Sequence, residues 1–144
     1  MQEATHHGPY MEKPAVFIEV GSSEKEWADE RLASMVADSL IGGLGDYAML
    51  EEYGESYAPV IALGGLHYAN SFKKLTLDSE YAVGHICPKH MLGRITENPQ
   101  LLQQAMAACS PAAKKVVLDW KGLGSEKQKI KELLESSGID YFRV

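Results

Sequence analysis

The chain lacks any hydrophobic run long enough to cross a membrane. Its longest apolar stretches, such as those around Phe17 and Val117, are far shorter than the roughly 20 residues that a transmembrane helix needs. The first residues also lack the basic and apolar regions of a secretory signal peptide. We therefore expect a cytoplasmic protein without a membrane partner.

Cysteines are few, and the common nucleotide-binding motifs are missing. Cys87 and Cys109 are the two cysteines among 144 residues, and in a reducing cytosol we expect both to be free thiols. Neither GxGxxG nor a Walker pattern occurs, which argues against the nucleotide-binding loops built on them. With 45% hydrophobic and 24% charged residues, the chain does not have a disordered or fibrous composition. Its length fits one domain, residues 1–144.

Acidic and basic residues are divided unequally along the chain. Residues 1–72 carry twelve acidic and three basic side chains, a net charge of −9, whereas residues 73–144 carry eight acidic and eleven basic ones, a net charge of +3. Together they give the net charge of −6. A local basic face can bind phosphates on a protein of negative total charge, because the local potential governs encounter. For Lys127, Lys129 and Lys131, a solvated helix face is the simpler interpretation.

The first half of the chain predicts two strands with a helix between them. The expected elements are a buried strand at residues 14–20, a helix from Ser23 to Gly42-Gly43, a connection at residues 46–56 and a second buried strand at residues 59–63. Ser23 followed by Glu26 is a capping-box pattern, which marks the helix start. The pair Gly64-Gly65 ends the second strand and lets the backbone approach a ligand or another segment closely.

The second half adds a hairpin, two helices and two strands. The expected elements are strands at residues 72–77 and 80–87, a helix from Pro99 to about Ser110, a strand at residues 115–120, a helix from Ser125 to Gly138 and a strand at residues 139–144. Strands that alternate with helices imply a largely parallel sheet covered on both faces. We therefore predict an α/β fold with three layers, a mixed and mostly parallel sheet, and an inserted antiparallel hairpin.

Histidines are concentrated near the predicted strand ends. All five lie in the first 90 residues, as His6, His7, His67, His85 and His90. Ligands of open α/β sheets bind beyond the carboxyl ends of the strands, where His67 follows the second predicted strand and Glu19 ends the first. Imidazoles act as general acids or bases near neutral pH or as zinc ligands, and a carboxylate can ligate or accept a proton. The residues leave both chemistries open.

Cys87 offers a third chemistry, a thiolate nucleophile beside His85 or His90. A cysteine at a strand end is more often a small buried hydrophobic residue, and we favour that interpretation. The spacing of Cys87 and its neighbouring histidines matches no standard metal motif.

Four segments of the chain together resemble a known family. They are Glu3-Ala4-Thr5-His6-His7-Gly8-Pro9, Glu19-Val20-Gly21-Ser22-Ser23-Glu24-Lys25-Glu26-Trp27, Gly64-Gly65-Leu66-His67-Tyr68-Ala69 and Gly84-His85-Ile86. In this order and spacing, they resemble the archaeal and plant type of D-aminoacyl-tRNA deacylase.

The resemblance implies an activity, a cofactor and a partner. The activity is hydrolysis of the ester between a D-amino acid and the 3′ end of tRNA, which releases the amino acid and free tRNA. The implied cofactor is zinc, and the implied partner is tRNA. The implied fold is similar to those of peptidyl-tRNA hydrolase and the purine phosphorylases.

Carried over residue by residue, the resemblance implies a histidine-rich site. The expected catalytic residues are His6, His7, Glu19, His67 and His85, and the expected zinc ligands are His6, His7, His67 and His85. We expect substrate contacts from Gly8, Gly64, Gly65, Tyr68, Lys73, Lys74 and Lys89, and further tRNA phosphate contacts from Arg94, Lys114 and Lys115. A water activated by zinc or by a histidine would attack the aminoacyl carbonyl. Backbone N–H groups around Gly64-Gly65 or Gly8 would hold the oxyanion.

The chain departs from the family pattern in three places. Leu66 stands where the family usually has a small residue, and Asn70-Ser71 replaces the Pro-Arg that commonly follows His-Tyr-Ala. Lys73 and Lys74 can supply positive charge there without the bidentate geometry of arginine. Family members also carry a substantial region before the His6-His7 loop, so we expect either a C-terminal portion of a longer protein or a shortened stand-alone relative.

Two other functions fit the same residues. One is a peptidyl-tRNA hydrolase-like or other metal-dependent amidohydrolase, which would prefer an N-blocked, amide-linked substrate. The other is a non-catalytic RNA-binding module. A deacylation assay combined with metal analysis separates all three functions.

Overall fold

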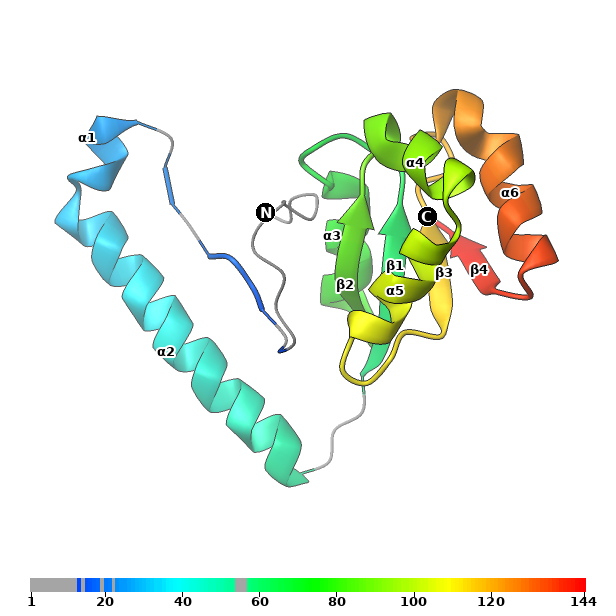
Figure 1. Ribbon diagram of the computed structural model, residues 1–144. Coiled ribbons are helices and arrows are strands. Elements are labelled where there is room, and N and C mark those ends of the chain that lie inside the picture. Colours follow the sequence, from blue (N-terminus) through cyan, green and yellow to red (C-terminus); the bar gives the residue numbers. More distant parts are fainter. Residues whose placement is uncertain (1–12, 14, 19, 22, 54–56) are drawn as a thin grey trace. The chain divides into compact units, whose positions relative to one another are not determined.

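The computed structural model describes Lys13 and residues 15–18, 20–21, 23–53 and 57–144 (Figure 1). These residues belong to two compact units, one formed by Lys13 with residues 57–144 and the other by residues 15–18, 20–21 and 23–53. Within these ranges, no helix is both long and apolar enough to cross a membrane.

The larger unit is built on a sheet of four parallel strands. In chain order they are β1 (Ala58–Leu63), β2 (Tyr81–Cys87), β3 (Lys115–Leu118) and β4 (Asp140–Arg143), and their order in the sheet is β2-β1-β3-β4. The strands predicted at residues 59–63, 80–87, 115–120 and 139–144 are therefore confirmed as β1, β2, β3 and β4.

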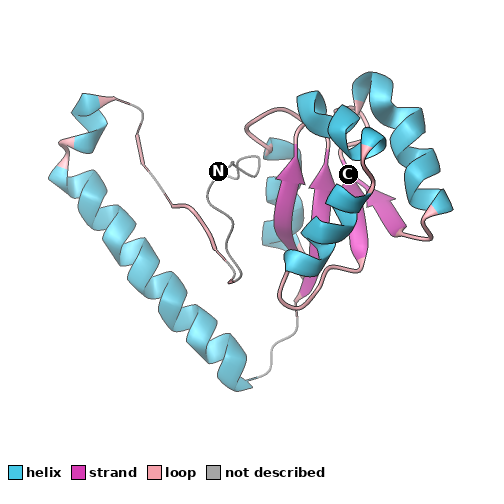
Figure 2. Ribbon diagram, viewed as in Figure 1, coloured by secondary structure: helices cyan, strands magenta, loops and turns pink. Residues whose placement is uncertain are grey.

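Helices cover both faces of this sheet (Figure 2). One face carries α3 (Asn70–Asp78); the other carries α4 (Leu92–Glu97), α5 (Gln100–Ala108) and α6 (Lys127–Ser136). Two short 3₁₀ turns, η1 (Lys89–Met91) and η2 (Gly124–Glu126), precede α4 and α6. The predicted three-layer α/β class is confirmed.

The two cores are separated by the alternation of the central strands. Val60 packs with Phe72 of α3, whereas its neighbour Ile61 packs with Leu92 of α4 and Ile130 of α6. Successive side chains of a strand point to opposite faces, and both faces of this sheet are covered. All five side chains are at most 1% exposed, which explains why β1 reads as one uninterrupted apolar run.

The predicted hairpin is wrong. Residues 70–78 form α3 instead of a strand, and β2 pairs with β1 in parallel. Phe72 and Leu75 lie three residues apart and both pack toward the sheet, while Lys73 and Lys74 are exposed. In a segment this short, the spacing of apolar residues fits the strand period of 2 and the helix period of 3.6 almost equally well. Packing against the sheet therefore decides whether the segment forms a strand or a helix. Among the described residues, the strands of the sheet are consequently all parallel, and the predicted mixed sheet is wrong for them.

A bulge in β2 changes the direction of its later side chains. Val60 pairs with Val83 and Ile61 pairs with His85, so Gly84 is the extra residue between them. A Cβ atom on Gly84 would lie 2.5 Å from the Cys109 Sγ atom, which explains why glycine is needed there. The extra residue places His85 on the face of the sheet that α5 covers.

The strand predicted at residues 14–20 is wrong for the residues that the structure describes there. None of residues 15–18 and 20 lies in a strand, and the side chains of Val16 and Phe17 are 86% and 70% exposed. β-Branched and aromatic residues favour extended backbone, but strand formation also requires a hydrogen-bonded neighbour, which the local sequence does not reveal.

The helix predicted from Ser23 is broken once and extends further than expected. The smaller unit contains α1 (Glu24–Trp27) and α2 (Glu30–Tyr53). Asp29 caps α2, because its Oδ1 atom accepts the N–H groups of Arg31 at 2.9 Å and Leu32 at 3.3 Å. Ser23 donates its hydroxyl to the Glu26 carboxylate, but its side chain makes no hydrogen bond that caps α1, so the predicted capping by Ser23 is wrong.

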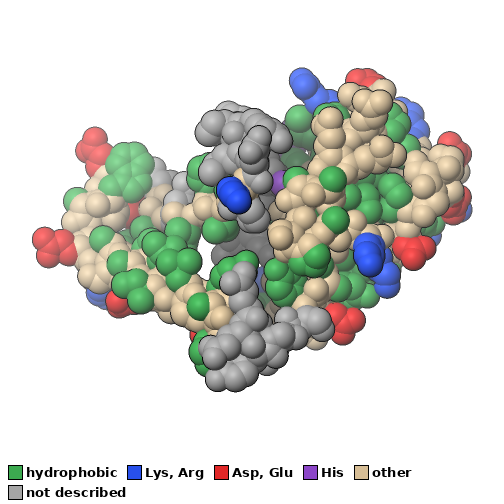
Figure 3. Space-filling model, turned by 60° about the horizontal axis from the view of Figure 1, so that its bottom comes forward, with side chains coloured by type: hydrophobic (Ala, Val, Ile, Leu, Met, Phe, Trp, Pro, Cys, Tyr) green, Lys and Arg blue, Asp and Glu red, His purple; other side chains and the backbone are tan. Residues whose placement is uncertain are grey.

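The predicted helix end at Gly42-Gly43 is also wrong, since α2 continues to Tyr53 and includes part of the predicted connection. Glycine ends a helix when it adopts a positive φ angle, and neither of these two does. Two apolar side chains of α2, Ile41 and Leu44, are more than 60% exposed. Figure 3 shows hydrophobic side chains, in green, at the surface of the protein.

Candidate functional site

The carboxyl ends of the parallel strands meet at one edge of the sheet, and the loops after β1, β2 and β3 lie there. From β1 the chain crosses through α3 to β2, whereas from β3 it crosses through α6 to β4, on the other side of the sheet. The order of the strands therefore reverses between β1 and β3. Open α/β sheets bind ligands at such a switch point.

Backbone hydrogen bonds hold these three loops together. The N–H of Gly64 donates to the Cys87 carbonyl at 2.9 Å, and the N–H of Lys89 donates to the Gly65 carbonyl at 2.9 Å. The N–H of Gly65 donates to the Gly122 carbonyl at 3.3 Å. Gly64 and Gly65 have φ angles of 104° and 78°, a region that favours glycine. The amides of the glycine pair are thus already bonded within the fold.

Asp119 is the first residue after β3, and its carboxylate joins the loop after β3 to the first turn of α3. Its Oδ2 atom accepts the Ser71 hydroxyl at 2.9 Å, and its Oδ1 atom accepts the Gly122 N–H at 2.8 Å. A Cβ atom on Gly122 would lie 2.4 Å from the Gly65 nitrogen, so the loops after β1 and β3 touch backbone to backbone.

Two pockets open at this edge. The first, of about 430 Å³, we call the histidine pocket; its lining comprises Gly65, Leu66, His67, Lys89, His90, Gly93, Ser125 and Glu126. The second, of about 360 Å³, we call the aspartate pocket; its lining comprises Gly65, Leu66, Tyr68, Asn70, Ser71, Lys89, Asp119 and Gly122. Gly65, Leu66 and Lys89 belong to both pockets, so the two are adjacent.

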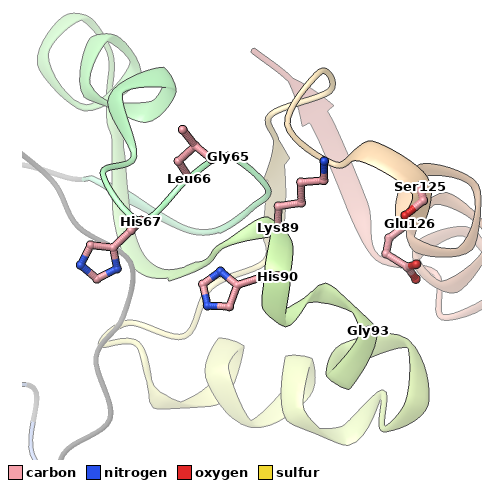
Figure 4. Close-up of a pocket in the computed structure, with 8 residues that line it drawn as sticks. All are labelled: Gly65, Leu66, His67, Lys89, His90, Gly93, Ser125 and Glu126. Atoms are coloured by element: carbon pink, nitrogen blue, oxygen red, sulfur yellow. The ribbon is translucent and has the colours of Figure 1, made fainter.

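The histidine pocket combines two imidazoles with charged groups. Figure 4 shows His67 on the loop after β1 and His90 on the turn after β2, with Lys89 beside His90 and Glu126 across the pocket. The Glu126 Oε2 atom lies 3.3 Å from the Lys129 Nζ atom. The His67 ring meets the Tyr68 ring edge to face, with 5.2 Å between centroids. These groups can accept a proton and stabilise negative charge.

The structure brings together part of the predicted site. Gly65, His67, Tyr68 and Lys89 line the pockets, with Gly64 buried directly before them. His85 lines neither pocket; it lies within β2, and burial lowers the pKa of its imidazole below the ordinary value of 6.5. Lys73 and Lys74 are exposed on α3 and line neither pocket. The predicted site residues His6, His7, Gly8 and Glu19 lie outside the described residues.

Three ionisable pocket residues were not among the expected site residues: His90, Asp119 and Glu126. Asp119 directly follows an apolar strand, and His90 lies three residues beyond another, so the rule that predicted His67 also applied to them. Glu126 could not be found in this way, since it lies on η2 and reaches the pocket only through the packing of α6.

The described residues do not complete a zinc site. Catalytic zinc usually has three protein ligands. In the part of the chain that the structure describes, no three His, Cys, Asp or Glu side chains lie close enough to hold a metal ion. The predicted ligand set includes His6 and His7, which lie outside that part, so zinc binding stays a prediction.

Cys87 is poorly suited to nucleophilic catalysis. Its side chain packs against the core that contains α4, α5 and α6. Burial raises the pKa of the Cys87 thiol to about 11 and also raises the pKa of Cys109. At neutral pH both are therefore thiols, which are weak nucleophiles, as expected for buried cysteines.

The fold and the pocket define an α/β protein with a pocket beyond the carboxyl edge of its parallel sheet, lined by two imidazoles. Comparison with known proteins makes this class more specific. A family model described as D-aminoacyl-tRNA deacylase matches residues 1–142. The chain belongs to this family.

Individual relatives agree with the family model. D-aminoacyl-tRNA deacylases of Cenarchaeum symbiosum, Thermococcus kodakarensis and Methanococcus maripaludis are 37%, 36% and 38% identical to the chain over 96%, 98% and 99% of its length. The matches cover 50%, 50% and 54% of those proteins, so the chain spans about half the length of the curated relatives it matches.

A solved structure has a similar fold. The crystal structure of a conserved protein of unknown function superimposes with a TM-score of 0.74 at 29% sequence identity. The match covers 98% of this chain and 47% of that one.

Proposed function

We propose that this chain hydrolyses the ester bond of D-aminoacyl-tRNA in the cytoplasm, releasing a D-amino acid and free tRNA. The observation that carries the proposal is the family match over residues 1–142, which includes every loop of the two pockets. The named activity of relatives that are 36–38% identical over nearly the whole chain supports it.

The histidine pocket supplies groups suited to this reaction. A neutral imidazole of His67 or His90 accepts a proton from water as the water attacks the ester carbonyl, a contribution of roughly 100- to 10,000-fold. The Lys89 ammonium provides positive charge for the developing oxyanion, because the Gly64 and Gly65 amides are already bonded. The leaving group is the 3′ hydroxyl of tRNA.

Zinc is a separate part of the proposal. Its predicted ligands are His6, His7, His67 and His85, and a bound zinc ion would lower the pKa of a water molecule toward about 7. Elemental analysis of the purified chain, with and without chelator, tests this part. Zinc at a constant ratio to protein that is lost in the His67→Ala variant supports it, whereas a zinc-free protein that retains deacylase activity contradicts it.

Single substitutions test the catalytic assignment. We expect His67→Ala or His90→Ala to lower kcat for D-Tyr-tRNA hydrolysis by about 100-fold or more, because the pocket loses a proton acceptor. His6→Ala, His7→Ala, Glu19→Ala and His85→Ala complete the series. Gln103→Ala, at an exposed position of α5, is the matched control and retains activity. Full activity in all the site variants, each with normal thermal unfolding, would contradict the proposed site.

Three substrates separate the proposal from its alternatives. D-Tyr-tRNA, L-Tyr-tRNA and N-acetyl-Tyr-tRNA differ only in the configuration or blocking of the amino acid. Preference for the free D-aminoacyl ester supports the proposal. Preference for the N-acetylated substrate indicates a peptidyl-tRNA hydrolase-like enzyme, and binding without hydrolysis of any of the three indicates an RNA-binding module.

A further inference from the structure

The aspartate pocket contains groups that the hydrolysis step does not use. We propose, on the basis of the proposed function, that it is a nucleoside subsite. In this subsite Tyr68 stacks on the 3′-terminal adenine of tRNA, and Asp119 accepts a hydrogen bond from a ribose hydroxyl. The pocket volume of about 360 Å³ lies within the range of small-molecule sites.

Tyr68 has the exposure and the support that a stacking platform needs. Its side chain is 55% exposed at the pocket, although it is a large aromatic group. The edge-to-face contact with the His67 ring supports the Tyr68 ring. The neighbouring Leu66 side chain is 76% exposed and adds apolar surface beside it. Proteins recognise unpaired nucleotides chiefly by stacking bases on exposed aromatic rings, and the 3′ end of tRNA is unpaired.

Asp119 has unused acceptor capacity. A carboxylate accepts about four hydrogen bonds, and within the described residues Asp119 accepts one from the Ser71 hydroxyl at 2.9 Å and one from the Gly122 N–H at 2.8 Å. These two bonds fix its orientation at the switch point between β1 and β3. A carboxylate repels phosphate but accepts readily from a hydroxyl, so this position suits the ribose. Lys89, which lines both pockets, carries the charge suited to a phosphate.

The arrangement of the two pockets assigns the parts of the substrate. Tyr68 lines the aspartate pocket and the preceding residue, His67, lines the histidine pocket. Gly65, Leu66 and Lys89 are common to both. A terminal adenosine in the aspartate pocket therefore has a direct path for its aminoacyl ester into the histidine pocket.

Nucleotide binding to the full chain tests the subsite without any reaction. Adenosine 5′-monophosphate is the probe, and its affinity is measured by calorimetry or by NMR titration. We expect Tyr68→Ala to weaken binding by about 5- to 150-fold. Tyr68→Phe should bind the nucleotide about as tightly as the wild-type chain, because the phenyl ring still stacks. Leu77→Ala is the matched control, since Leu77 is an exposed apolar side chain on α3 outside both pockets.

The contact to ribose is tested in the same way. Asp119→Asn retains an Oδ1 acceptor for the Gly122 N–H, so the loop is expected to fold, but it removes the negative charge. We expect this variant to bind adenosine 5′-monophosphate about ten-fold more weakly than the wild-type chain does. Within the variant, the 2′-deoxy analogue should bind nearly as well as adenosine 5′-monophosphate, because the contact to the hydroxyl is already lost. Asp140→Asn, at an exposed position of β4, is the control and binds normally.

Deacylation kinetics distinguish this proposal from the proposed function. Tyr68→Ala is expected to raise KM for D-Tyr-tRNA with little change in kcat, in contrast to His67→Ala. Nucleotide affinity that neither Tyr68→Ala nor Asp119→Asn changes would overturn the subsite, even in an active deacylase. Nucleotide binding that follows the expected pattern in a chain without deacylase activity would support the subsite and overturn the proposed function.

Discussion

At the scale of single residues, the geometry of the site depends on where the loops have no room for a side chain. Gly122 lies against the Gly65 nitrogen and the Asp119 carboxylate, and a Cβ atom there would come within 2.4 Å and 2.5 Å of them. Both contacts involve groups that hydrogen bonds already fix. Glycine at this position is therefore a requirement of close packing between the loops after β1 and β3.

We expect Gly122→Ala to lower the free energy of unfolding by about 1–3 kcal/mol, because the added methyl group forces the two loops apart. Gly93→Ala is the matched control. Gly93 lies in α4, and apart from its chain neighbours and the helix backbone no atom lies within 4 Å of an added Cβ. The change is therefore expected to be neutral or to stabilise by up to about 1 kcal/mol. Urea unfolding measures both. Equal stability of the two variants would contradict the close-packing argument.

His85 predicts a pH dependence of stability. Burial holds the pKa of its imidazole below 6.5 in the folded chain, so the unfolded chain binds this proton more readily. The His85 contribution to stability is therefore fully present above about pH 6.5 and is lost as the pH falls below it. Thermal unfolding between pH 7 and pH 5 is expected to show a smaller decrease in Tm for His85→Gln than for the unchanged chain. The control Gln104→Ala keeps His85 and should show the same decrease in Tm as the wild-type chain. A decrease in His85→Gln equal to that of the wild-type chain would exclude His85 as its source.

At the scale of elements, packing decided between alternatives that local pattern left nearly equal. Phe72 and Leu75 fit a strand or a helix, and the sheet face formed by Val60 and Val117 selects the helix α3. The glycines near the middle of α2 lower helix propensity by roughly 1 kcal/mol each but do not stop the helix, since their backbone does not turn left-handed.

α3 is expected to depend on one anchoring side chain. Phe72 is completely buried between α3 and the sheet, so Phe72→Ala should lower the free energy of unfolding by about 3–5 kcal/mol. Leu77 lies on the same helix and is 70% exposed, so Leu77→Ala should change stability by no more than about 0.5 kcal/mol. Chemical denaturation compares the two. A small effect of Phe72→Ala would mean that α3 does not pack on the sheet as described.

At the scale of the whole molecule, the basic residues of the second half do not share one position. Lys89 lies at the carboxyl edge of the sheet in both pockets, whereas Lys115 is the first residue of β3 and so lies at the opposite edge. The Lys115 Nζ atom lies 5.9 Å from the centre of the Tyr81 ring, so its charge makes a cation–π contact within the protein. Sequence position alone did not distinguish these two lysines.

tRNA binding should therefore depend on Lys89 more than on Lys115. Each phosphate contact on a single strand contributes about −0.7 to the slope of log affinity against log salt. We expect Lys89→Ala to reduce the magnitude of the slope by about this amount and Lys115→Ala to leave it unchanged. Binding of uncharged tRNA between 50 and 200 mM salt, roughly the range over which such contacts are resolved, measures both. Equal slopes for the two variants would contradict a tRNA contact at Lys89.

Sequence patterns were sufficient for much of the fold and for part of the site. Residue patterns predicted the strands β1, β2, β3 and β4, and position after a strand predicted His67. The same rule would have led to Asp119, but not to Glu126, whose place in the pocket depends on how α6 packs. The inward position of His85 depends on the bulge at Gly84, which no local pattern reveals.

The sequence by itself determined the fold class and the family, because apolar runs and contiguous motifs consist of residues that are neighbours in the sequence. The tertiary structure alone decided which groups share a pocket, because parallel pairing brings residues such as Gly65 and Gly122, far apart in sequence, into backbone contact. Hydrogen bonds between loops depend on the register of the strands that carry them, and register is set by packing across the whole sheet.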